Sequence, residues 1–271
     1  MQRIRTLGQG GLGVVDLYLN TDGRYYAVKK VLQPWAQDHV RRFIREVKIM
    51  AGLEHPNIIK LVNHDVSGHN PWYVMPYYPD GSLRDRIRQY NSNGFGFTRE
   101  GASAIVYHLA SALSFAHKRG VLHRDLKPEN VLFAGKEPVL ADWGIGKFIH
   151  HESHTRIAYG IGTPIYCAPE QLQFGQADAR SDIYSLGIIY RELLTGSASG
   201  TVLDPRVRAI VNRMTAAQPQ DRYQSMDEII WAVRSLNVVN EKDPMQDFWK
   251  GVAVVGLSVA GVYLISKLLG G

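Results

Sequence analysis

The feature that most constrains the fold is a change of hydrophobic period along the chain. Residues 1–31 alternate apolar and polar side chains between glycine-containing turns, which is typical of paired β-strands. Most of the later chain repeats apolar residues at intervals of three and four, which is typical of amphipathic helices. The sequence therefore predicts an α+β fold in which a strand-rich part precedes a helix-rich part.

The first part is predicted to contain five strands and one helix. Three of the strands are expected within residues 1–31. Residues 40–53 place apolar side chains on one helix face, and Asp38 is a candidate N-cap for that helix. Two more strands are expected at about residues 59–66 and 72–77.

The second part is predicted to be mainly helical. Its longest helix is expected to begin after Thr98, a candidate N-cap, and to end near Gly120. Two short strands are expected at residues 131–133 and 139–141. Further helices are predicted at about residues 181–195, 204–214 and 225–236.

A glycine cluster lies between the first two predicted strands, at Gly8, Gly10, Gly11 and Gly13. Glycine lets the backbone approach a phosphate closely and offer amide N–H groups to its charge. A plain glycine-rich hairpin explains this pattern equally well. Because a strand follows the cluster and not a helix, the pattern argues against a dinucleotide-binding fold.

A lysine and a glutamate follow at a suggestive spacing. Lys29 lies on the third predicted strand, and Glu46 lies seventeen residues later on the predicted helix. A lysine that binds the α and β phosphates of a nucleotide needs a carboxylate that orients its ammonium group. Two unrelated surface charges are the alternative explanation.

The most specific motif is HRDLKPEN at residues 123–130, followed by Asp-Trp-Gly at residues 142–144. Ala-Pro-Glu at residues 168–170 and DIYSLG at residues 182–187 come next. In this order the motifs resemble those of the eukaryotic-type (Hanks-type) serine/threonine protein kinase family. The resemblance covers about residues 1–236.

The resemblance implies a two-lobed protein kinase fold. The N-lobe, about residues 1–77, is expected to hold a five-stranded antiparallel sheet and one helix. The C-lobe, about residues 78–236, is expected to be mainly helical. A linker at residues 237–248 and a transmembrane segment at residues 249–269 are expected to follow.

The resemblance also implies a role for each polar residue of the motifs. Asp125 corresponds to the base that accepts the proton of the substrate hydroxyl, and Lys127 to a cation that reaches the transferred phosphate. Asn130 and Asp142 offer oxygen ligands to Mg²⁺ bound with ATP, so ATP and Mg²⁺ are the implied cofactors. The implied catalytic residues are Lys29, Glu46, Asp125, Lys127 and Asn130.

The same match places apolar side chains around the adenine ring and two tyrosines at the hinge between the lobes. The implied ATP-binding residues are Gly8, Gly10, Gly11, Gly13, Val15, Ala27, Lys29, Met75, Tyr77, Tyr78 and Leu132. Pro76 stands where the family usually has an acidic residue, and it removes one backbone donor. Trp143 replaces the usual phenylalanine of the magnesium-binding turn, and we expect it to pack inward.

Three further expectations concern residues 124–222 of the expected C-lobe. Ser153 and Thr155 are hypothesised to be autophosphorylated, with Arg124 as the cation that holds the phosphate. Glu170 is expected to form a buried pair with Arg222. Because only residues 196–203 separate two predicted helices, the docking surface usual for the family is expected to be trimmed.

An uncharged run at residues 251–266, flanked by lysines, predicts a membrane segment. At ~1.5 Å per residue the run spans only about 24 Å of a ~30 Å hydrocarbon core, so flanking residues must contribute. The expectation is a single-pass tail anchor at residues 249–269; the alternative is a buried helix packed on the domain. Gly256 and Ala260 form a small-residue pair, on which a homodimer is hypothesised.

The overall composition narrows the partners. A net charge of +6 favours phosphate-bearing ligands or an anionic membrane surface, and no basic run interleaved with aromatics indicates nucleic acid. The one cysteine, Cys167, excludes an intrachain disulfide and indicates a reducing compartment, so the kinase domain is expected in the cytoplasm. Protein substrates with serine or threonine hydroxyls are implied. A membrane-anchored ATP-binding pseudokinase scaffold and a small-molecule kinase of related fold remain as alternatives.

Overall fold

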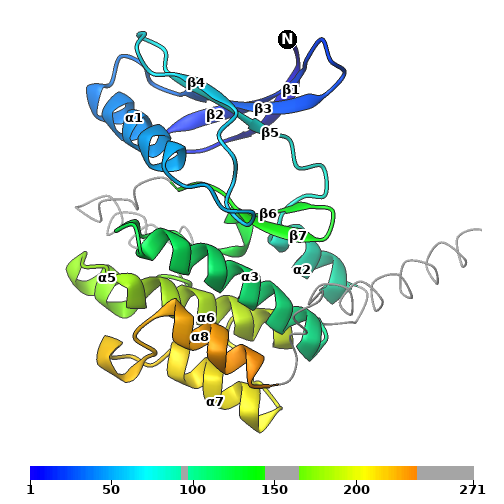
Figure 1. Ribbon diagram of the computed structural model, residues 1–271, viewed down its shortest axis with the longest axis vertical. Helices are drawn as coiled ribbons and strands as arrows, with labels where there is room; N and C mark the ends of the chain where they lie inside the picture. Colours follow the sequence, from blue (N-terminus) through cyan, green and yellow to red (C-terminus); the bar gives the residue numbers. More distant parts are fainter. Residues whose placement is uncertain (93–96, 144–164, 237–271) are drawn as a thin grey trace, which may run out of the picture.

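The computed structural model describes residues 1–92, 97–143 and 165–236, which form two lobes (Figure 1). The upper lobe contains an antiparallel sheet with the strand order β1-β2-β3-β5-β4 and one helix, α1. The predicted two-lobed α+β architecture is therefore confirmed. The upper-lobe elements are β1 (Gln2–Gln9), β2 (Gly13–Leu19), β3 (Tyr25–Val31), α1 (Gln37–Ala51), β4 (Asn63–Asp65) and β5 (Trp72–Pro76).

The lower lobe is built mainly from helices, with a two-stranded β6-β7 ribbon on the side that faces the upper lobe (Figure 1). Its helices are α2 (Leu83–Ser92), α3 (Arg99–His117), α5 (Pro169–Phe174), α6 (Ala179–Thr195), α7 (Pro205–Met214) and α8 (Met226–Arg234). Its other elements are η1 (Pro128–Asn130), β6 (Val131–Ala134), β7 (Glu137–Leu140) and η2 (Pro219–Asp221).

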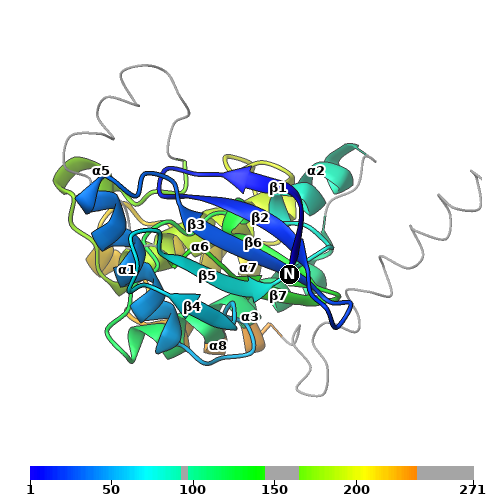
Figure 2. The same cartoon turned by 90° about the horizontal axis from the view of Figure 1, so that it is seen from above.

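Helix α1 lies beside the upper-lobe sheet, to its left in Figure 2. Its apolar face supplies Phe43, Val47 and Met50, each at most 2% exposed. The Phe43 ring packs against the ring of Tyr73 on β5 with centroids 5.5 Å apart. Burial of such side chains contributes roughly 1.5–3 kcal/mol each, so α1 is held by packing against the sheet.

The start of α1 differs from the prediction. The N-cap residue is Ala36, which makes no side-chain capping bond, and Asp38 lies in the first turn. There Asp38 forms an ion pair with Arg41. A carboxylate in the first turn interacts favourably with the helix dipole, so Asp38 still marks this end of the helix.

The fourth strand is shorter than predicted. Only Asn63–Asp65 pair as β4, whereas the strand was expected from residue 59. Ile58 and Ile59 are buried, but they pair with Leu140 of the lower lobe, and the Ile59 amide donates to the Leu140 carbonyl at 2.8 Å. The apolar residues that indicated a strand therefore join the two lobes.

Helix α3 forms the centre of the lower lobe. Thr98 caps it as predicted, with its side chain accepting a bond from the Gly101 amide at 3.1 Å. Helix α6 packs beside α3, and the Ser103 and Tyr190 hydroxyls are 2.5 Å apart at the contact. A Cβ at Gly187 of α6 would lie 2.7 Å from Met214, so glycine allows α7 to approach closely.

Helices α2 and α5 do not follow from the periodicity of the sequence. Helix α5 contains Glu170, and the expected pair with Arg222 is confirmed. Arg222 is 1% exposed and donates to both Glu170 carboxylate oxygens at 2.8 Å. Its remaining N–H groups donate to the carbonyls of Ala216, Arg180 and Ala217.

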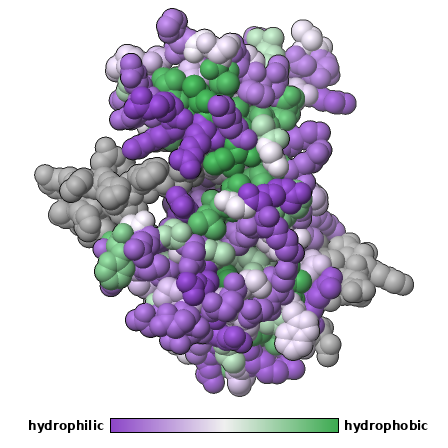
Figure 3. All heavy atoms as spheres, turned by 60° about the vertical axis from the view of Figure 1, so that its left-hand side comes forward, coloured by the Kyte–Doolittle hydropathy of each residue, from purple (hydrophilic) through white to green (hydrophobic). Residues whose placement is uncertain are grey.

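The two lobes differ in the polarity of one face. On the face that Figure 3 shows, hydrophilic side chains cover most of the lower lobe, and hydrophobic ones gather in the upper lobe. Among the residues described, no helix combines the length and apolar character that a membrane crossing requires. The predicted linker at 237–248 and the predicted segment at 249–269 lie outside the described residues.

Candidate active site

Lys29 lies where the two lobes meet. Strand β3 presents its ammonium group 2.7 Å from Glu46 Oε1 of α1 and 2.9 Å from Asp142 Oδ1, just after β7. Glu46 and Asp142 lie 17 and 113 positions after Lys29 in the sequence, and the fold brings the three residues together. The lysine thereby connects the sheet, α1 and the lower lobe.

Glu46 is oriented by a second donor that the sequence motifs do not reveal. The Tyr73 hydroxyl donates to Glu46 Oε1 at 2.7 Å, and both residues are at most 2% exposed. Glu46 Oε2 is buried and has no hydrogen-bond partner among the described residues. A buried carboxylate in this state depends strongly on Lys29 for its charge balance.

The charges of this cluster shift two pKa values. Burial opposes the ammonium of Lys29, but the neighbouring Tyr73, Glu46 and Asp142 outweigh burial and hold the pKa of Lys29 well above its ordinary value. Lys29 lowers the pKa of the Asp142 carboxyl against the opposing effect of burial, and Lys127 adds a smaller lowering. Near neutral pH both groups are therefore charged.

The loop between α3 and β6 holds the next three predicted residues. Lys127 Nζ donates to Asp125 Oδ2 at 2.8 Å. The side-chain amide of Asn130 donates to the Asp125 backbone carbonyl at 2.8 Å and lies 3.3 Å from Asp125 Oδ2. The Asp125 carboxylate is therefore flanked by an ammonium and an amide, and its side chain remains 33% exposed.

A buried carboxylate on α6 fixes the start of this loop. Asp182, 1% exposed, accepts bonds from the backbone amides of His123 at 2.9 Å and Arg124 at 2.8 Å. His117 of α3 bonds the same carboxylate at 2.8 Å. Asp182 belongs to a motif that the sequence shows. Its hydrogen bonds, however, are to residues 58 and 59 positions earlier in the chain, and no local sequence pattern indicates them.

Backbone strain is concentrated at the same place. Among the described residues, the non-glycine residues with positive φ are Arg124, at 63°, and Asp142, at 59°. A left-handed conformation costs a non-glycine residue of order 1–3 kcal/mol and persists only where the surroundings enforce it. The loop and the turn after β7 are therefore held in defined conformations.

Trp143 packs inward, as expected from its aromatic character. It is 1% exposed, donates from its indole N–H to the Leu140 carbonyl at 3.2 Å, and contacts the His123 ring edge-on at 4.9 Å. The larger ring is thus accommodated beneath the cleft. Gly144, the last residue of this motif, lies outside the described residues.

The predicted glycines fall around the β1–β2 turn. A Cβ at Gly13 would lie 2.6 Å from the Lys30 backbone carbonyl, so this position requires glycine. No atom lies within 4 Å of a Cβ built at Gly8, Gly10 or Gly11. These glycines therefore border open space, where a ligand can approach the backbone.

The residues expected around adenine come from both lobes. Ala27 on β3 is buried and pairs with Met75 on β5, and Val15 on β2 pairs with Lys29. Leu132 on β6 supplies the lower-lobe side. Tyr77 and Tyr78 follow β5 in the connection between the lobes, where Pro76 ends the strand opposite Tyr26.

The donor set fits Mg²⁺. Asp142 offers a carboxylate whose side chain is 47% exposed. Asn130 uses its amide nitrogen toward Asp125, and its amide oxygen accepts no hydrogen bond within the described part of the chain. Carboxylate and amide oxygens are ligands that Mg²⁺ prefers, and it is usually held by one or two carboxylates together with phosphates.

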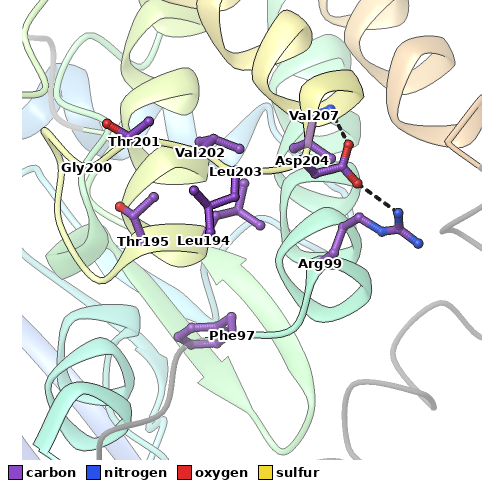
Figure 4. Close-up of a pocket in the computed structure, with 10 residues that line it drawn as sticks. All are labelled: Phe97, Arg99, Leu194, Thr195, Gly200, Thr201, Val202, Leu203, Asp204 and Val207. Carbon is purple, nitrogen blue, oxygen red and sulfur yellow. Dashed lines mark hydrogen bonds and ion pairs between the residues drawn. The ribbon is translucent and has the colours of Figure 1, made fainter.

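A separate cavity of about 510 Å³ lies away from this site, in the lower lobe (Figure 4). Residues 200–203, in the short connection expected to trim the docking surface, line it with Phe97, Arg99 and Asp204. The Arg99–Asp204 ion pair closes one side, as the dashed line in Figure 4 shows.

The hypothesised phosphorylation sites, Ser153 and Thr155, lie outside the described residues.

Comparisons with known proteins agree with this geometry. The protein kinase domain family matches residues 1–251. Serine/threonine-protein kinase PknJ of Mycobacterium tuberculosis is 32% identical over 270 residues, covering 96% of this chain and 45% of PknJ. Serine/threonine-protein kinase PknD of Chlamydia pneumoniae is 30% identical, covering 83% of this chain and 30% of PknD.

Among solved structures, the crystal structure of the Mycobacterium tuberculosis PknI kinase domain is similar to this chain. The TM-score is 0.66 at 27% identity, with 86% of this chain and 94% of that domain covered. This chain spans less than half the length of PknJ and PknD.

Proposed function

The chain belongs to the protein kinase domain family, and we propose that it is a serine/threonine protein kinase. The reaction is transfer of the γ-phosphate of Mg-ATP to serine or threonine hydroxyls of protein substrates. The observation that carries the proposal is the cluster around Lys29, which joins α1 to Asp142 beside the loop that holds Asp125.

The geometry supports a division of work among the residues. Lys29, oriented by Glu46, is placed to bind the α and β phosphates. Asp125 accepts the proton from the attacking hydroxyl, while Lys127 balances charge on the transferred phosphate. When bound, Mg²⁺ would neutralise phosphate charge, and Asn130 and Asp142 would hold it.

Labelled ATP tests the proposal. Wild-type protein should transfer label to a protein substrate, and Asp125→Asn should lower the rate by at least about 10²-fold because the proton acceptor is lost. Asp227→Asn is a matched control, because Asp227 also lies 2.8 Å from a lysine ammonium, that of Lys118, but in the first turn of α8, outside the site. ATP binding without any transfer in the wild-type protein would favour the pseudokinase alternative. Unchanged transfer in Asp125→Asn would refute the role of Asp125 as proton acceptor.

Autophosphorylation is the regulatory part of the proposal. Ser153 and Thr155 lie between the magnesium-binding turn and the Ala-Pro-Glu motif, and Arg124 precedes the catalytic loop aspartate. Mass spectrometry of ATP-treated protein should find phosphate at one or both positions. The Asp125→Asn protein, treated in the same way, should carry none; phosphate in both proteins would point to another kinase.

Membrane attachment rests on the uncharged run at residues 251–266. We propose that residues 249–269 span a membrane once, with the kinase domain in the cytoplasm, where ATP is available. The full chain should remain in the membrane pellet after a carbonate wash, and Leu257→Lys should release it, because a central lysine costs about 2.5–3.5 kcal/mol. A soluble wild-type chain would support the packed-helix alternative.

Dimerisation through this segment is the last part of the proposal. Gly256 and Ala260 are four residues apart and would leave a narrow groove on one helix face. Gly256→Leu should lower the dimer fraction in detergent cross-linking, whereas Leu264→Val should not. An unchanged dimer fraction in Gly256→Leu would remove this part alone.

A further inference from the structure

A cluster around Arg84 lies beside the catalytic loop, outside the residues discussed above. Arg84 on α2 donates from Nε to Glu129 Oε1 at 2.7 Å and from one terminal nitrogen to Glu192 Oε1 at 2.6 Å. Its other terminal nitrogen donates to the Tyr166 hydroxyl at 2.5 Å. Tyr166 in turn donates to Glu192 Oε2. We call these four residues the Arg84 cluster.

The cluster gathers elements that are remote in sequence. Glu129 lies in η1, directly before Asn130, whose amide oxygen is the proposed ligand of Mg²⁺. Tyr166 lies just before α5, and Glu192 lies on α6, the helix that also carries Asp182. One guanidinium therefore ties the end of the catalytic loop to the helix that fixes its start.

Burial and charge make this tie specific for arginine. The side chains of Arg84 and Glu192 are 15% and 8% exposed. Burial lowers the pKa of Arg84, but the hydrogen bonds that Arg84 donates to Glu192 and Glu129 outweigh burial and raise that pKa above its ordinary value. A planar guanidinium can serve three acceptors in fixed directions, which an ammonium on a flexible stem cannot do.

The two ends of the catalytic loop are held differently. Asp182 grips the start through backbone amides of His123 and Arg124. The end is gripped through the Glu129 side chain, which is 45% exposed and would be free to turn into solvent without Arg84. The turn that contains Asn130 would then lose a restraint.

We propose that Arg84 is a positioning residue for phosphoryl transfer, which acts through Glu129 to hold the turn that presents the Asn130 amide oxygen. This role rests on the proposed kinase function. Arg84 touches neither ATP nor the reacting hydroxyl in this account. Replacing Arg84 should therefore change kcat and the dependence of the rate on Mg²⁺ more than the affinity for ATP.

Steady-state kinetics over a range of Mg²⁺ concentrations tests the role. Arg84→Met should lower kcat about tenfold, as expected for a small displacement of a catalytic group, and should raise the Mg²⁺ concentration for half-maximal rate. Arg86→Met is the matched control, because Arg86 lies on the same helix but covers the Phe133 ring at 3.6 Å and bonds the Gly135 carbonyl. That variant should keep the wild-type kcat and Mg²⁺ response.

A double-mutant cycle identifies the route. Glu129→Gln should reproduce the loss of kcat, and Arg84→Met added to it should cost less than about threefold more, because both changes break one link. Fully additive losses would show that Arg84 does not act through Glu129, and would overturn the proposal. So would a wild-type kcat and Mg²⁺ response in Arg84→Met.

The result is separable from failure of the kinase proposal. Wild-type protein and Arg86→Met that transfer no phosphate would refute the kinase function, and this role with it. Active wild-type protein with an equally active Arg84→Met would refute this role alone. Should Arg84→Met fail to fold, Glu129→Gln decides, because its 45% exposed side chain can be replaced without disturbing the core, and unchanged kinetics there overturn the proposal.

Discussion

Two ion pairs of this protein have nearly equal lengths but very different surroundings. In the lower lobe, Arg222 meets Glu170 at 2.8 Å, and every N–H group of the guanidinium has an acceptor. In the cleft, Lys29 meets Glu46 at 2.7 Å, but Glu46 Oε2 has no partner among the described residues. Asp142, the third member of the cleft cluster, is 47% exposed.

The difference distinguishes the Arg222–Glu170 pair, which stabilises the fold, from the Lys29–Glu46 pair, which belongs to the candidate active site. A saturated pair leaves nothing for a ligand and fixes the position of α5 against α6. An unsaturated cluster keeps charge and oxygen atoms available, at the cost of strain at Asp142 and an incompletely bonded carboxylate at Glu46. Removing the first pair should therefore affect stability most, and removing the second should affect chemistry most.

The largest expected effect is on folding. Arg222→Met should lower the free energy of unfolding by about 3–5 kcal/mol, because Glu170 and three backbone carbonyl groups lose the hydrogen bonds that Arg222 donates. Urea unfolding followed by circular dichroism measures this loss. Arg208→Met, at an exposed position of α7, should change stability by less than about 0.5 kcal/mol. A loss under about 1 kcal/mol for Arg222→Met would contradict the scaffold role.

The second effect is on activity. Lys29→Met should lower phosphate transfer by about 10²–10³-fold through lost electrostatic stabilisation. Its loss of stability should stay below that of Arg222→Met, because Asp142 is partly exposed and Glu46 keeps its bond from Tyr73. Lys30→Met is the control, since Lys30 is the next residue and contacts Tyr18 outside the cleft. Equal stability losses at Lys29 and Arg222 would remove the contrast.

The third effect appears in acid. Burial raises the pKa of Glu170, but hydrogen bonds from Arg222 and Ser181 outweigh it, so the pKa in the folded protein lies below its ordinary value of 4.5. A lowered pKa in the folded state means that the stabilisation is complete above the unfolded value and is lost as pH falls through the folded value. Wild-type protein should therefore lose stability more steeply below about pH 4.5 than Glu170→Gln does. Parallel curves of urea midpoint against pH would argue against this linkage.

The smallest effect concerns the second donor to Glu46. Tyr73→Phe removes one buried hydrogen bond and should cost about 1 kcal/mol of stability, with a loss of activity of only a few-fold. Tyr26→Phe, on the neighbouring strand, is the control because its hydroxyl makes no bond to Glu46. A loss of activity as large as that of Lys29→Met would mean that Tyr73, and not Lys29, orients the carboxylate.

The sequence predicts the order of elements and the chemistry of the candidate active site, because both are indicated by short stretches of consecutive residues. Alternation indicates the strands around Lys29, and the motif at residues 123–130 carries its residue types at fixed spacing. The contacts of Asp182, Tyr73 and Arg84 could not be predicted, because each joins residues at least 27 positions apart and leaves no periodic signal.

The predicted bounds of some strands and helices are wrong for a related reason. Ile58 and Ile59 have the apolar character of a strand, yet their backbone pairs with Leu140 of the other lobe. The six-residue helix α5 is too short to show a helical period, and it is held by the Glu170–Arg222 pair and by Gly175 in a left-handed C-cap. Tertiary contacts decide such segments, not local propensity.

Calorimetric titration with ATP, with Mg²⁺ or with a chelator, tests most directly the claim that the cleft cluster is left open for a metal-bound nucleotide. We expect Mg²⁺ to tighten ATP binding by at least about tenfold in the wild-type protein, and Asp142→Asn, with its fold intact, to lose that gain. Equal ATP affinity with and without Mg²⁺ in the wild-type protein would contradict the account.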